Sequence, residues 1–533
     1  MVRPEVAHIA AMETSLQYGG DSCRICTLTQ SCIHLHICTS AYLHISHIPT
    51  FSHICTFTTF ATMSRGKGTK APQVFEDVSI IDIAEEGKGV GKADDFVLFV
   101  EKAIPGDIVD VQVYRSKKNF GEAKITALKQ ASIHRVTAFC EHFGTCGGCK
   151  WQHMTYDAQL QFKQKTVADA LARLAKVEVG GMLPIVASPV DRYYRNKLEF
   201  TFSNKRWLYD GENRDDAELN MNALGFHIPG RFDKILDVRH CYLQADPSNS
   251  IRNSIDSFAR ANAYTYYDLR NHEGNLRNLI IRTSSTGELM VIVVFAYADE
   301  ERVNKLMGFV AAEFPQITSL LYILNQKKND TIFDQEVHAF KGPEYIHEEM
   351  NGIRFRIGPK SFYQTNSAQA KRLYEITRDF ADFKGDELVY DLYTGAGTIA
   401  NFVAGHVREV VGVEYVPDAI EDAKINSAIN NISNTKFYAG DMKDVLSAEF
   451  VAEHGKPDVV ITDPPRAGMH ADVVARLMEI EAEKIVYVSC NAATQARDLL
   501  VLKEKYDVVT IQPVDMFPHT QHVENVVLLR IRK

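Results

Sequence analysis

The chain has 533 residues, of which 45% are hydrophobic and 24% are charged, and its formal net charge is −9. This composition is typical of globular proteins, and the length is enough for about two to four domains. No run of about 18 apolar residues occurs, which excludes a transmembrane helix. The acidic balance argues against indiscriminate binding to nucleic acid, although it leaves room for a local basic groove.

The first 62 residues differ in composition from the rest of the chain. They hold five of the ten cysteines and six of the 19 histidines but only five charged residues, without helical or strand periodicity. They lack the basic and apolar stretches of a secretory signal, and Met63 offers a natural start. We predict that residues 1–62 are a non-native or disordered extension. The alternative is a zinc site whose spacing matches no common motif well: Cys23, Cys26, His34 and His36.

Residues 63–135 predict a small β-barrel, because short β-like runs alternate with turns that contain glycine or proline. The runs and the glycine-rich turn are Val78–Ile83, 87–91, Val97–Val100, Val109–Val113 and Ala123–Leu128. The pattern resembles a TRAM domain, an OB-like RNA-binding module. This resemblance depends on the placement of glycine and proline and on Arg115, Lys117 and Lys118. A barrel that serves only for packing is the alternative.

Four cysteines characterise the next region, residues 136–345. Cys140, Cys146 and Cys149 are clustered around a Gly-Gly pair, and Cys241 follows about 90 residues later. Four thiolates suit either zinc or an iron–sulfur cluster. The ten cysteines are too sparse for a disulfide scaffold, so we expect a cytoplasmic protein.

The same central region is predicted to be mainly antiparallel. A helix is expected over 155–177, where it could pack on the C-terminal domain, because apolar residues recur there at mostly helical spacings. Three β-like runs and one hairpin turn follow: Lys197–Phe202, Leu279–Arg282, Leu289–Phe295 and Ser284–Gly287.

Residues 346–533 predict a doubly wound α/β domain, because strand-like runs alternate with helical stretches. The runs are Leu388–Leu392, Glu409–Glu414, Lys436–Ala439, Val459–Thr462 and Ile485–Ser489. The last two runs, Val508–Val514 and Val523–Ile531, are joined by a loop too short for a helix, so they must be antiparallel. A parallel sheet with a terminal hairpin is the class I methyltransferase version of this fold.

A nucleotide site is predicted at the first strand of this domain. Asp391–Thr398 contains Gly-x-Gly and opens a helix, and Glu414 ends the next strand, where a carboxylate can accept ribose hydroxyls. The absence of a third glycine and the terminal hairpin favour S-adenosylmethionine (SAM) over NAD. Asp441 either faces the adenine or only caps a turn.

Two later strands end in reactive groups. Asp463-Pro464-Pro465-Arg466 follows one strand, and Ser489-Cys490-Asn491 ends the next. Ligands of an open α/β sheet bind at the carboxyl ends of its strands. Cys490 is therefore a candidate nucleophile.

Together these motifs resemble the RNA uracil-5-methyltransferases of the RumA/TrmA type. Ser361–Asn366, Tyr194–Lys197 and His522–Asn525 add to the resemblance, which covers about residues 73–533. It implies that Cys490 is the nucleophile and Glu524 the general base. It also implies four SAM-binding residues: Gln364, Tyr393, Glu414 and Asp463.

The resemblance to the RumA branch implies a [4Fe–4S] cluster on Cys140, Cys146, Cys149 and Cys241, with zinc as the alternative. It also implies a monomer that methylates 23S rRNA, with tRNA as the alternative substrate. In such enzymes the thiolate adds to carbon 6 of uracil and makes carbon 5 reactive, and the base must leave its stack. A radical-SAM enzyme is a more distant alternative. Such an enzyme would need the spacing Cys-x3-Cys-x2-Cys, whereas Cys140, Cys146 and Cys149 are spaced Cys-x5-Cys-x2-Cys.

Overall fold

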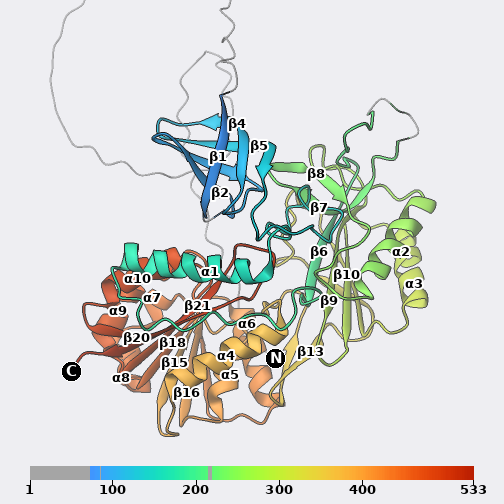
Figure 1. Ribbon diagram of the computed structural model, residues 1–533. Helices are drawn as coiled ribbons and strands as arrows, with labels where there is room; N and C mark the ends of the chain where they lie inside the picture. The colour runs from blue at the N-terminus through green and yellow to red at the C-terminus, as the bar shows by residue number, and fades with distance from the viewer. Residues whose placement is uncertain (1–72, 85, 214–215, 217–218) are drawn as a thin grey trace, which may run out of the picture. The chain divides into compact units, whose positions relative to one another are not determined.

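The computed structural model describes residues 73–84, 86–213, 216 and 219–533 (Figure 1). The predicted extension over residues 1–62 and its alternative zinc site lie outside these residues. The described chain forms a β-barrel, a central sheet and a C-terminal α/β region (Figure 1). Among the described residues no helix is long and apolar enough to cross a membrane.

Five strands close into the barrel in the order β1-β2-β3-β5-β4. Their bounds are Val74–Ile83, Gly89–Ala93, Phe96–Glu101, Ile108–Ser116 and Phe120–Gln130. The turn predicted at 87–91 is wrong in part, because Gly89 and Gly91 lie inside β2. A Cβ on Gly89 would lie 2.7 Å from the Ala103 carbonyl oxygen, and one on Gly91 would lie 2.6 Å from Val78. These two glycines therefore allow close packing inside the barrel and do not form the predicted turn.

A helix follows the barrel and packs on the C-terminal region. The helix α1 spans Tyr156–Ala170 and continues as one π-helical turn over Leu171–Ala175, within the predicted range 155–177. Its buried Lys163 forms an ion pair with Asp515, which directly follows strand β20 (Tyr506–Val514). Val167 and Leu171 belong to the core on one face of the C-terminal sheet.

The central region is a seven-stranded sheet in the order β12-β11-β10-β9-β6-β7-β8. All of its neighbouring strands are antiparallel except β10 and β11, which are parallel. Helix α3 separates these two in the chain and makes the parallel crossover possible. The strands are β6 Lys197–Ser203, β7 Ala223–Ile228, β8 Arg231–Asp237, β9 Leu276–Thr283, β10 Leu289–Phe295, β11 Ser319–Leu324 and β12 Val337–Lys341. The helices are α2 Ser248–Ala261 and α3 Glu300–Glu313, which pack together beside the sheet (Figure 1).

The C-terminal region begins with a hairpin that the sequence pattern did not predict, β13 Ile346–Met350 and β14 Ile353–Ile357. Its main sheet has the order β17-β16-β15-β18-β19-β21-β20, in which only β21 runs antiparallel to its neighbours. The strands are β15 Leu388–Leu392, β16 Glu409–Glu414, β17 Thr435–Ala439, β18 Val459–Thr462, β19 Lys484–Ser489, β20 Tyr506–Val514 and β21 Glu524–Ile531. This is the predicted class I methyltransferase topology.

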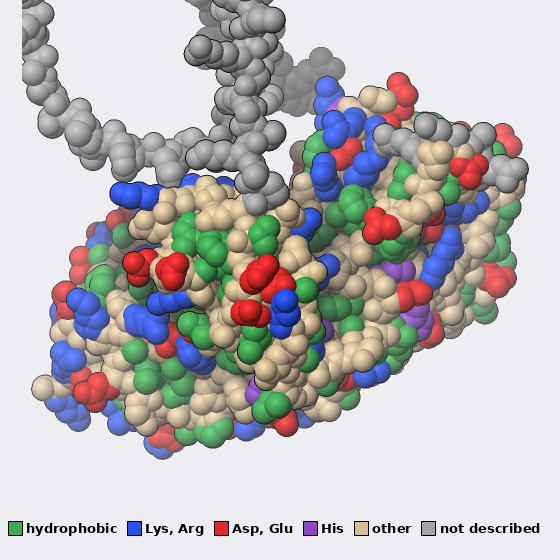
Figure 2. Space-filling model, turned by 45° about the horizontal axis from the view of Figure 1, so that its top comes forward, with side chains coloured by type: hydrophobic (Ala, Val, Ile, Leu, Met, Phe, Trp, Pro, Cys, Tyr) green, Lys and Arg blue, Asp and Glu red, His purple; other side chains and the backbone are tan. Residues whose placement is uncertain are grey.

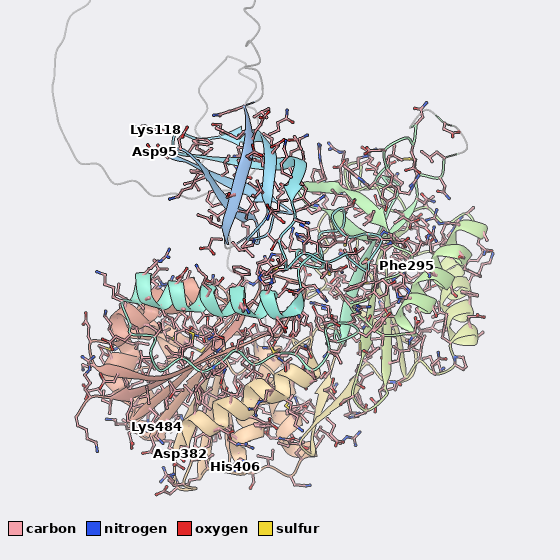
Figure 3. The ribbon with its side chains drawn as sticks, viewed as in Figure 1. Asp95, Lys118, Phe295, Asp382, His406 and Lys484 are labelled. Carbon is pink, nitrogen blue, oxygen red and sulfur yellow. The ribbon has the colours of Figure 1, made fainter. Side chains whose placement is uncertain are left out.

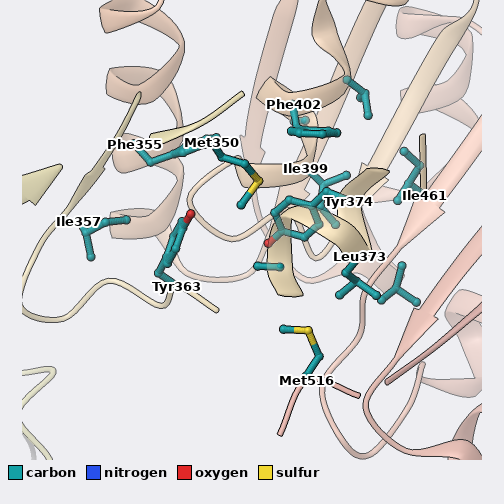
Figure 4. Packing of buried hydrophobic residues seen from close by; sticks show 14 of the residues in the cluster. Met350, Phe355, Ile357, Tyr363, Leu373, Tyr374, Ile399, Phe402, Ile461 and Met516 are labelled. Carbon is teal, nitrogen blue, oxygen red and sulfur yellow. The ribbon is translucent and has the colours of Figure 1, made fainter. Parts of the chain in front are cut away.

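Helices cover both faces of this sheet, and each face has its own hydrophobic core. In the first core, Leu373 and Tyr374 of α4 pack with Ile399 and Phe402 of α5 and with Phe355 of the hairpin (Figure 4). The helices are α4 Ser367–Ala381, α5 Thr398–Ala404, α6 Pro417–Ile429, α7 Met442–Val445, α8 Ala448–His454, α9 Ala471–Ile480 and α10 Ala492–Leu502. The two buried faces hold the strand ends, and with them the site, in fixed positions.

Candidate active site

The sheet brings four predicted residues to one side, the edge formed by the carboxyl ends of its parallel strands. Tyr393, Glu414, Asp463 and Cys490 each end or follow one of the parallel strands β15, β16, β18 and β19. Because β21 runs in the opposite direction, its first residue, Glu524, lies at the same edge. The pairing of Ser489 with Asn525 places Cys490 next to Glu524. At the amino end of β19, Lys484 lies at the opposite edge with Asp382 (Figure 3).

A cleft of about 1570 Å³ opens at this edge. It is lined by all six predicted catalytic and SAM-binding residues, namely Gln364, Tyr393, Glu414, Asp463, Cys490 and Glu524. Pockets for one small molecule usually measure about 300–1000 Å³. The cleft therefore has room for a nucleoside cofactor and a second nucleotide.

The glycine loop is shaped for a ligand that approaches its backbone. Gly397 has φ +72° and Gly395 has φ +54°, and a Cβ on Gly395 would meet nothing within 4 Å. Glu414 accepts hydrogen bonds from the backbone N–H of Gly395 at 3.2 Å and of Val416 at 2.9 Å. These bonds orient the carboxylate at the cleft, as ribose binding requires. Asp441 caps α7, as one of its two sequence interpretations predicts, and it also lines the cleft.

Two carboxyl groups that line the cleft, Asp463 and Glu524, together with Asp391 near Asp463, make the cleft suited to a cation. Burial raises the pKa of Asp391 to about 7, and burial with the neighbouring Asp391 raises the pKa of Asp463 to about 7. Burial, with Asp463 as a smaller cause, raises the pKa of Glu524 to about 8. A cationic ligand would stabilise their ionised forms. SAM carries a positive sulfonium, so the residues present fit it.

Cys490 lies between β19 and α10, directly before the cap of that helix. The Asn491 side chain accepts hydrogen bonds from the backbone N–H of Ala493 and of Thr494. Burial raises the pKa of the Cys490 thiol to about 11, and Glu524 and Asp463 add to the rise, whereas Arg466 lowers it. Arg466 is thus the nearby cation that favours the thiolate.

Two hydrogen bonds hold the loop of Arg466 against the loop of Cys490. The Arg466 carbonyl accepts from the Asn491 side-chain amide at 3.3 Å and from the Thr494 hydroxyl at 3.1 Å. The guanidinium of Arg466 lies 3.4 Å from a ring nitrogen of His522. The motifs Asp463–Arg466 and Ser489–Asn491 therefore form one structural unit.

The loop of residues 515–523, between β20 and β21, positions Glu524, and the sequence analysis missed how it is anchored. The Asp515 carboxylate forms a fully buried ion pair with Lys163 of α1 at 2.5 Å. It also accepts a hydrogen bond from the Tyr156 hydroxyl at 2.9 Å. The Asn366 side chain donates to the Met516 carbonyl at 3.0 Å. A lysine on the buried face of a predicted helix was the only sequence signal for this anchor.

A second anchor holds the loop that carries Gln364. Asn196 donates a backbone hydrogen bond to the Thr365 carbonyl at 2.8 Å and a side-chain hydrogen bond to the Gln364 carbonyl at 2.9 Å. Arg282 donates to the Ser361 carbonyl at 2.7 Å. Two of the motifs noted in the sequence, Tyr194–Lys197 and Ser361–Asn366, are therefore in direct contact.

The four cysteines predicted to bind a cluster line one small cavity: Cys140, Cys146, Cys149 and Cys241. Burial raises the pKa of Cys146 to about 11 and that of Cys149 to about 12, and the neighbouring thiols add to both shifts. Within the described part of the chain, no group of three or more His, Cys, Asp or Glu side chains is arranged to hold a metal ion. The structure thus gathers the four thiols at one cavity, but their described arrangement does not form a metal-binding group.

The sheet topology, the glycine loop and the acidic cleft define a SAM-dependent methyltransferase. Residues 340–532 match the family model of tRNA (Uracil-5-)-methyltransferase, and residues 75–126 match the TRAM domain. An uncharacterized RNA methyltransferase of Bacteroides thetaiotaomicron is 57% identical over 84% of this chain and 100% of its own length. One from Porphyromonas gingivalis is 56% identical over 85% of this chain and 99% of its own.

The similarity extends to a solved structure, the Pyrococcus abyssi tRNA (uracil-54, C5)-methyltransferase in complex with S-adenosyl-L-homocysteine (SAH). It is 29% identical with a TM-score of 0.67, covering 85% of this chain and 100% of that chain. The chain belongs to the tRNA (uracil-5-)-methyltransferase family and is a SAM-dependent RNA methyltransferase with a TRAM domain. The predicted family is confirmed.

Proposed function

We propose that the protein methylates carbon 5 of a uridine in RNA through a covalent bond between the Cys490 sulfur and carbon 6. The observation that carries the proposal is that Cys490, directly after β19, and Glu524, at the start of the adjacent strand β21, line one cleft together with Asp463. Carbon 5 of uracil is a weak nucleophile. Addition of a thiolate to carbon 6 moves an electron pair toward carbon 5 and splits one difficult step into easier ones.

Each residue then has a defined task. The Cys490 thiolate forms the bond to carbon 6, and Arg466 supports its ionisation. SAM supplies the methyl group. Glu524 accepts the proton from carbon 5, after which the electron pair of that C–H bond reforms the double bond and expels the thiolate. Burial raises the pKa of Glu524 to about 8, and the guanidinium of Arg466 opposes that rise, so Arg466 favours the ionised carboxylate that must act as the base.

RNA that contains 5-fluorouridine tests this mechanism. Fluorine at carbon 5 leaves no proton for Glu524 to remove after methyl transfer, so the adduct with Cys490 should accumulate. We expect a complex that survives denaturing electrophoresis with the wild type and none with Cys490→Ala. Normal turnover of uridine RNA by Cys490→Ala would exclude covalent catalysis by this residue.

We propose 23S rRNA as the substrate, because the resemblance joins the TRAM barrel and the four cysteines in the branch that modifies rRNA. The Pyrococcus abyssi relative matches this chain along its full length and acts on tRNA by its name, which supports tRNA as the second candidate. Mass mapping of 5-methyluridine in both RNAs from a deletion strain separates the two. If the deletion removes 5-methyluridine from tRNA and not from rRNA, the rRNA substrate is rejected.

Binding of folded RNA would rely on local contacts. Lys and Arg side chains are interspersed with Asp and Glu over the visible face of the described residues (Figure 2). Lys118, one of the three basic positions noted in the barrel, lies at the barrel tip near Asp95 (Figure 3). Shape and single-stranded segments, which dominate recognition of RNA, therefore fit this enzyme better than a broad positive surface.

We further propose that the four cysteines hold a [4Fe–4S] cluster with a structural role. The proposal is supported by the family resemblance and by the four thiols that line one cavity, which would have to move closer together to hold the cluster. Methyl transfer by thiolate addition needs no electron. Lys150 and Trp151, directly after Cys149, donate backbone hydrogen bonds to the His519 carbonyl at 2.8 and 3.0 Å. The cluster would thereby support the loop before Glu524. Purified protein should be brown. A colourless protein with stoichiometric zinc would show that the four cysteines bind zinc and not a cluster.

A further inference from the structure

A buried arginine holds the loop of residues 325–336, between β11 and β12, in one shape. Arg277 of β9 is 1% exposed and donates hydrogen bonds to the carbonyls of Asn325 at 2.7 Å and Asn329 at 2.8 Å. It also donates to the Asp330 carboxylate at 2.7 Å. One guanidinium therefore satisfies several polar groups of the loop, which is preshaped before any ligand binds.

The loop presents one large apolar side chain to the cleft. Ile332 packs against the hydrophobic core that the central sheet shares with the C-terminal region, and the next residue, Phe333, is 68% exposed and lines the catalytic cleft. Phe362, from the loop before α4, is 71% exposed and lines the same cleft. Aromatic side chains commonly line ligand pockets, and single-stranded nucleic acids stack their bases on such side chains. Neither the SAM-binding residues nor the catalytic pair accounts for Phe333.

We propose that Phe333 is a stacking platform for the nucleobase next to the target uridine, an inference that rests on the proposed function. A uridine that leaves its stack deprives its neighbour of a stacking partner. An aromatic ring can take that place for any base, because every base has a flat π face. Lys360 lines the same cleft and could contact the phosphate between the two nucleotides.

The sequence offers a direct optical test, because the chain has only two tryptophans. Trp151 is 1% exposed and Trp207 is partly buried in the core of the central region. The variant Phe333→Trp adds a reporter at the rim. The matched control is Phe232→Trp, since Phe232 is 64% exposed but belongs to strand β8 and does not line the cleft.

Both variants would be titrated with a single-stranded RNA of about 12 nucleotides with one central uridine, and separately with SAH. We expect the RNA to quench the emission of Phe333→Trp after subtraction of the wild-type signal, and to leave Phe232→Trp unchanged. SAH alone should quench neither. Quenching by SAH alone would assign Phe333 to the cofactor and overturn the proposal. Equal quenching in the two variants, or none in Phe333→Trp, would also overturn it.

Kinetics give a second, independent readout. Phe333→Ala should lower kcat/KM for RNA about tenfold, chiefly through KM, because loss of one base–aromatic stack costs that much. Its affinity for SAH should equal that of the wild type, and Phe333→Trp, whose ring can still stack, should lose less kcat/KM than Phe333→Ala. An abasic site next to the target uridine should slow the wild type about tenfold but slow Phe333→Ala no further. Additive losses would contradict the stack, and 5-fluorouridine trapping by the wild type tests the methyl-transfer chemistry separately.

Discussion

Two thiol sites of this chain are similarly buried but have different neighbours. The pKa of Cys490 is raised to about 11 by burial and by Glu524 and Asp463, and the guanidinium of Arg466 opposes that rise. At Cys149 burial raises the pKa to about 12, and the neighbouring thiols Cys146 and Cys241 raise it further. A thiol beside a cation and a base is arranged for chemistry at carbon. Thiols that destabilise one another's thiolate forms have no such neighbour, and the cluster that we propose for them would supply the missing positive charge.

The largest effect should come from Cys490→Ala. Without the sulfur no adduct with carbon 6 forms, and methyl transfer should fall by at least about a thousandfold. Transfer of labelled methyl groups from SAM to unmethylated RNA measures this loss. SAH affinity, determined by calorimetry, should stay within about twofold, which shows that the cleft is intact. Residual turnover within about tenfold of the wild type would show that Cys490 is no more essential for methyl transfer than the four clustered cysteines.

The second effect should come from Glu524→Gln, which keeps the shape but removes the base. Methyl transfer can still occur, but the carbon 5 proton then leaves slowly, so kcat should fall about 100-fold or more. The methylated adduct should accumulate on ordinary uridine RNA and survive denaturing electrophoresis. The matched control is Glu479→Gln, because it makes the same change at an exposed glutamate of α9. A slow variant without accumulated adduct would assign the proton to another group.

The fold was largely predictable because its elements have strong periods. Buried parallel strands such as Ile485–Ser489 are continuous apolar runs, and their helices follow at helical spacing. The hairpin β13–β14 was missed because its two strands are only five residues each and carry charges such as Glu348 and Arg356. The glycines of β2 were assigned to a turn because close packing across a barrel is a tertiary property.

The site was predictable only where local pattern and topology coincide. Glu414, Asp463 and Cys490 follow strands of a parallel sheet, so the rule for strand ends is sufficient to place them. Gln364 precedes the sheet and Glu524 begins an antiparallel strand, and both were proposed from the family resemblance. The ion pair of Lys163 with Asp515 joins residues 352 positions apart, and no local pattern specifies such a contact.

A third prediction concerns the cation at the catalytic thiol. Arg466 lowers the pKa of Cys490, so Arg466→Gln should raise that pKa and reduce the thiolate fraction at pH 7. Because the thiolate is the reactive form, the rate of the wild type should increase with pH, and the profile of the variant should shift to higher pH. A shift of about one unit corresponds to about a tenfold loss at pH 7. The two rates should converge only above the wild-type pKa of about 11, so between pH 6 and 10 the variant should show a lower kcat at every pH.

The measurement is kcat at saturating RNA between pH 6 and 10, since Arg466 is exposed and could also bind a phosphate. Arg466→Lys should restore part of the activity and most of the profile. The matched control is Arg476→Gln, which removes an exposed arginine from α9 and should leave the profile unchanged. If Arg466→Gln instead raises KM for RNA at every pH and leaves kcat unchanged, Arg466 is a phosphate contact.

The smallest effect on methyl transfer should come from Cys149→Ser, which completes the comparison. Loss of one ligand should remove the colour or the bound metal and lower the melting temperature by several degrees. The remaining folded protein should still form the 5-fluorouridine adduct within about threefold of the wild type, since Cys490 keeps its neighbours. Cys490→Ala should show the reverse, full metal content and no adduct. If folded Cys149→Ser forms no adduct, the His519 contact transmits the state of the four cysteines to Glu524, and the two thiol sites act as one unit.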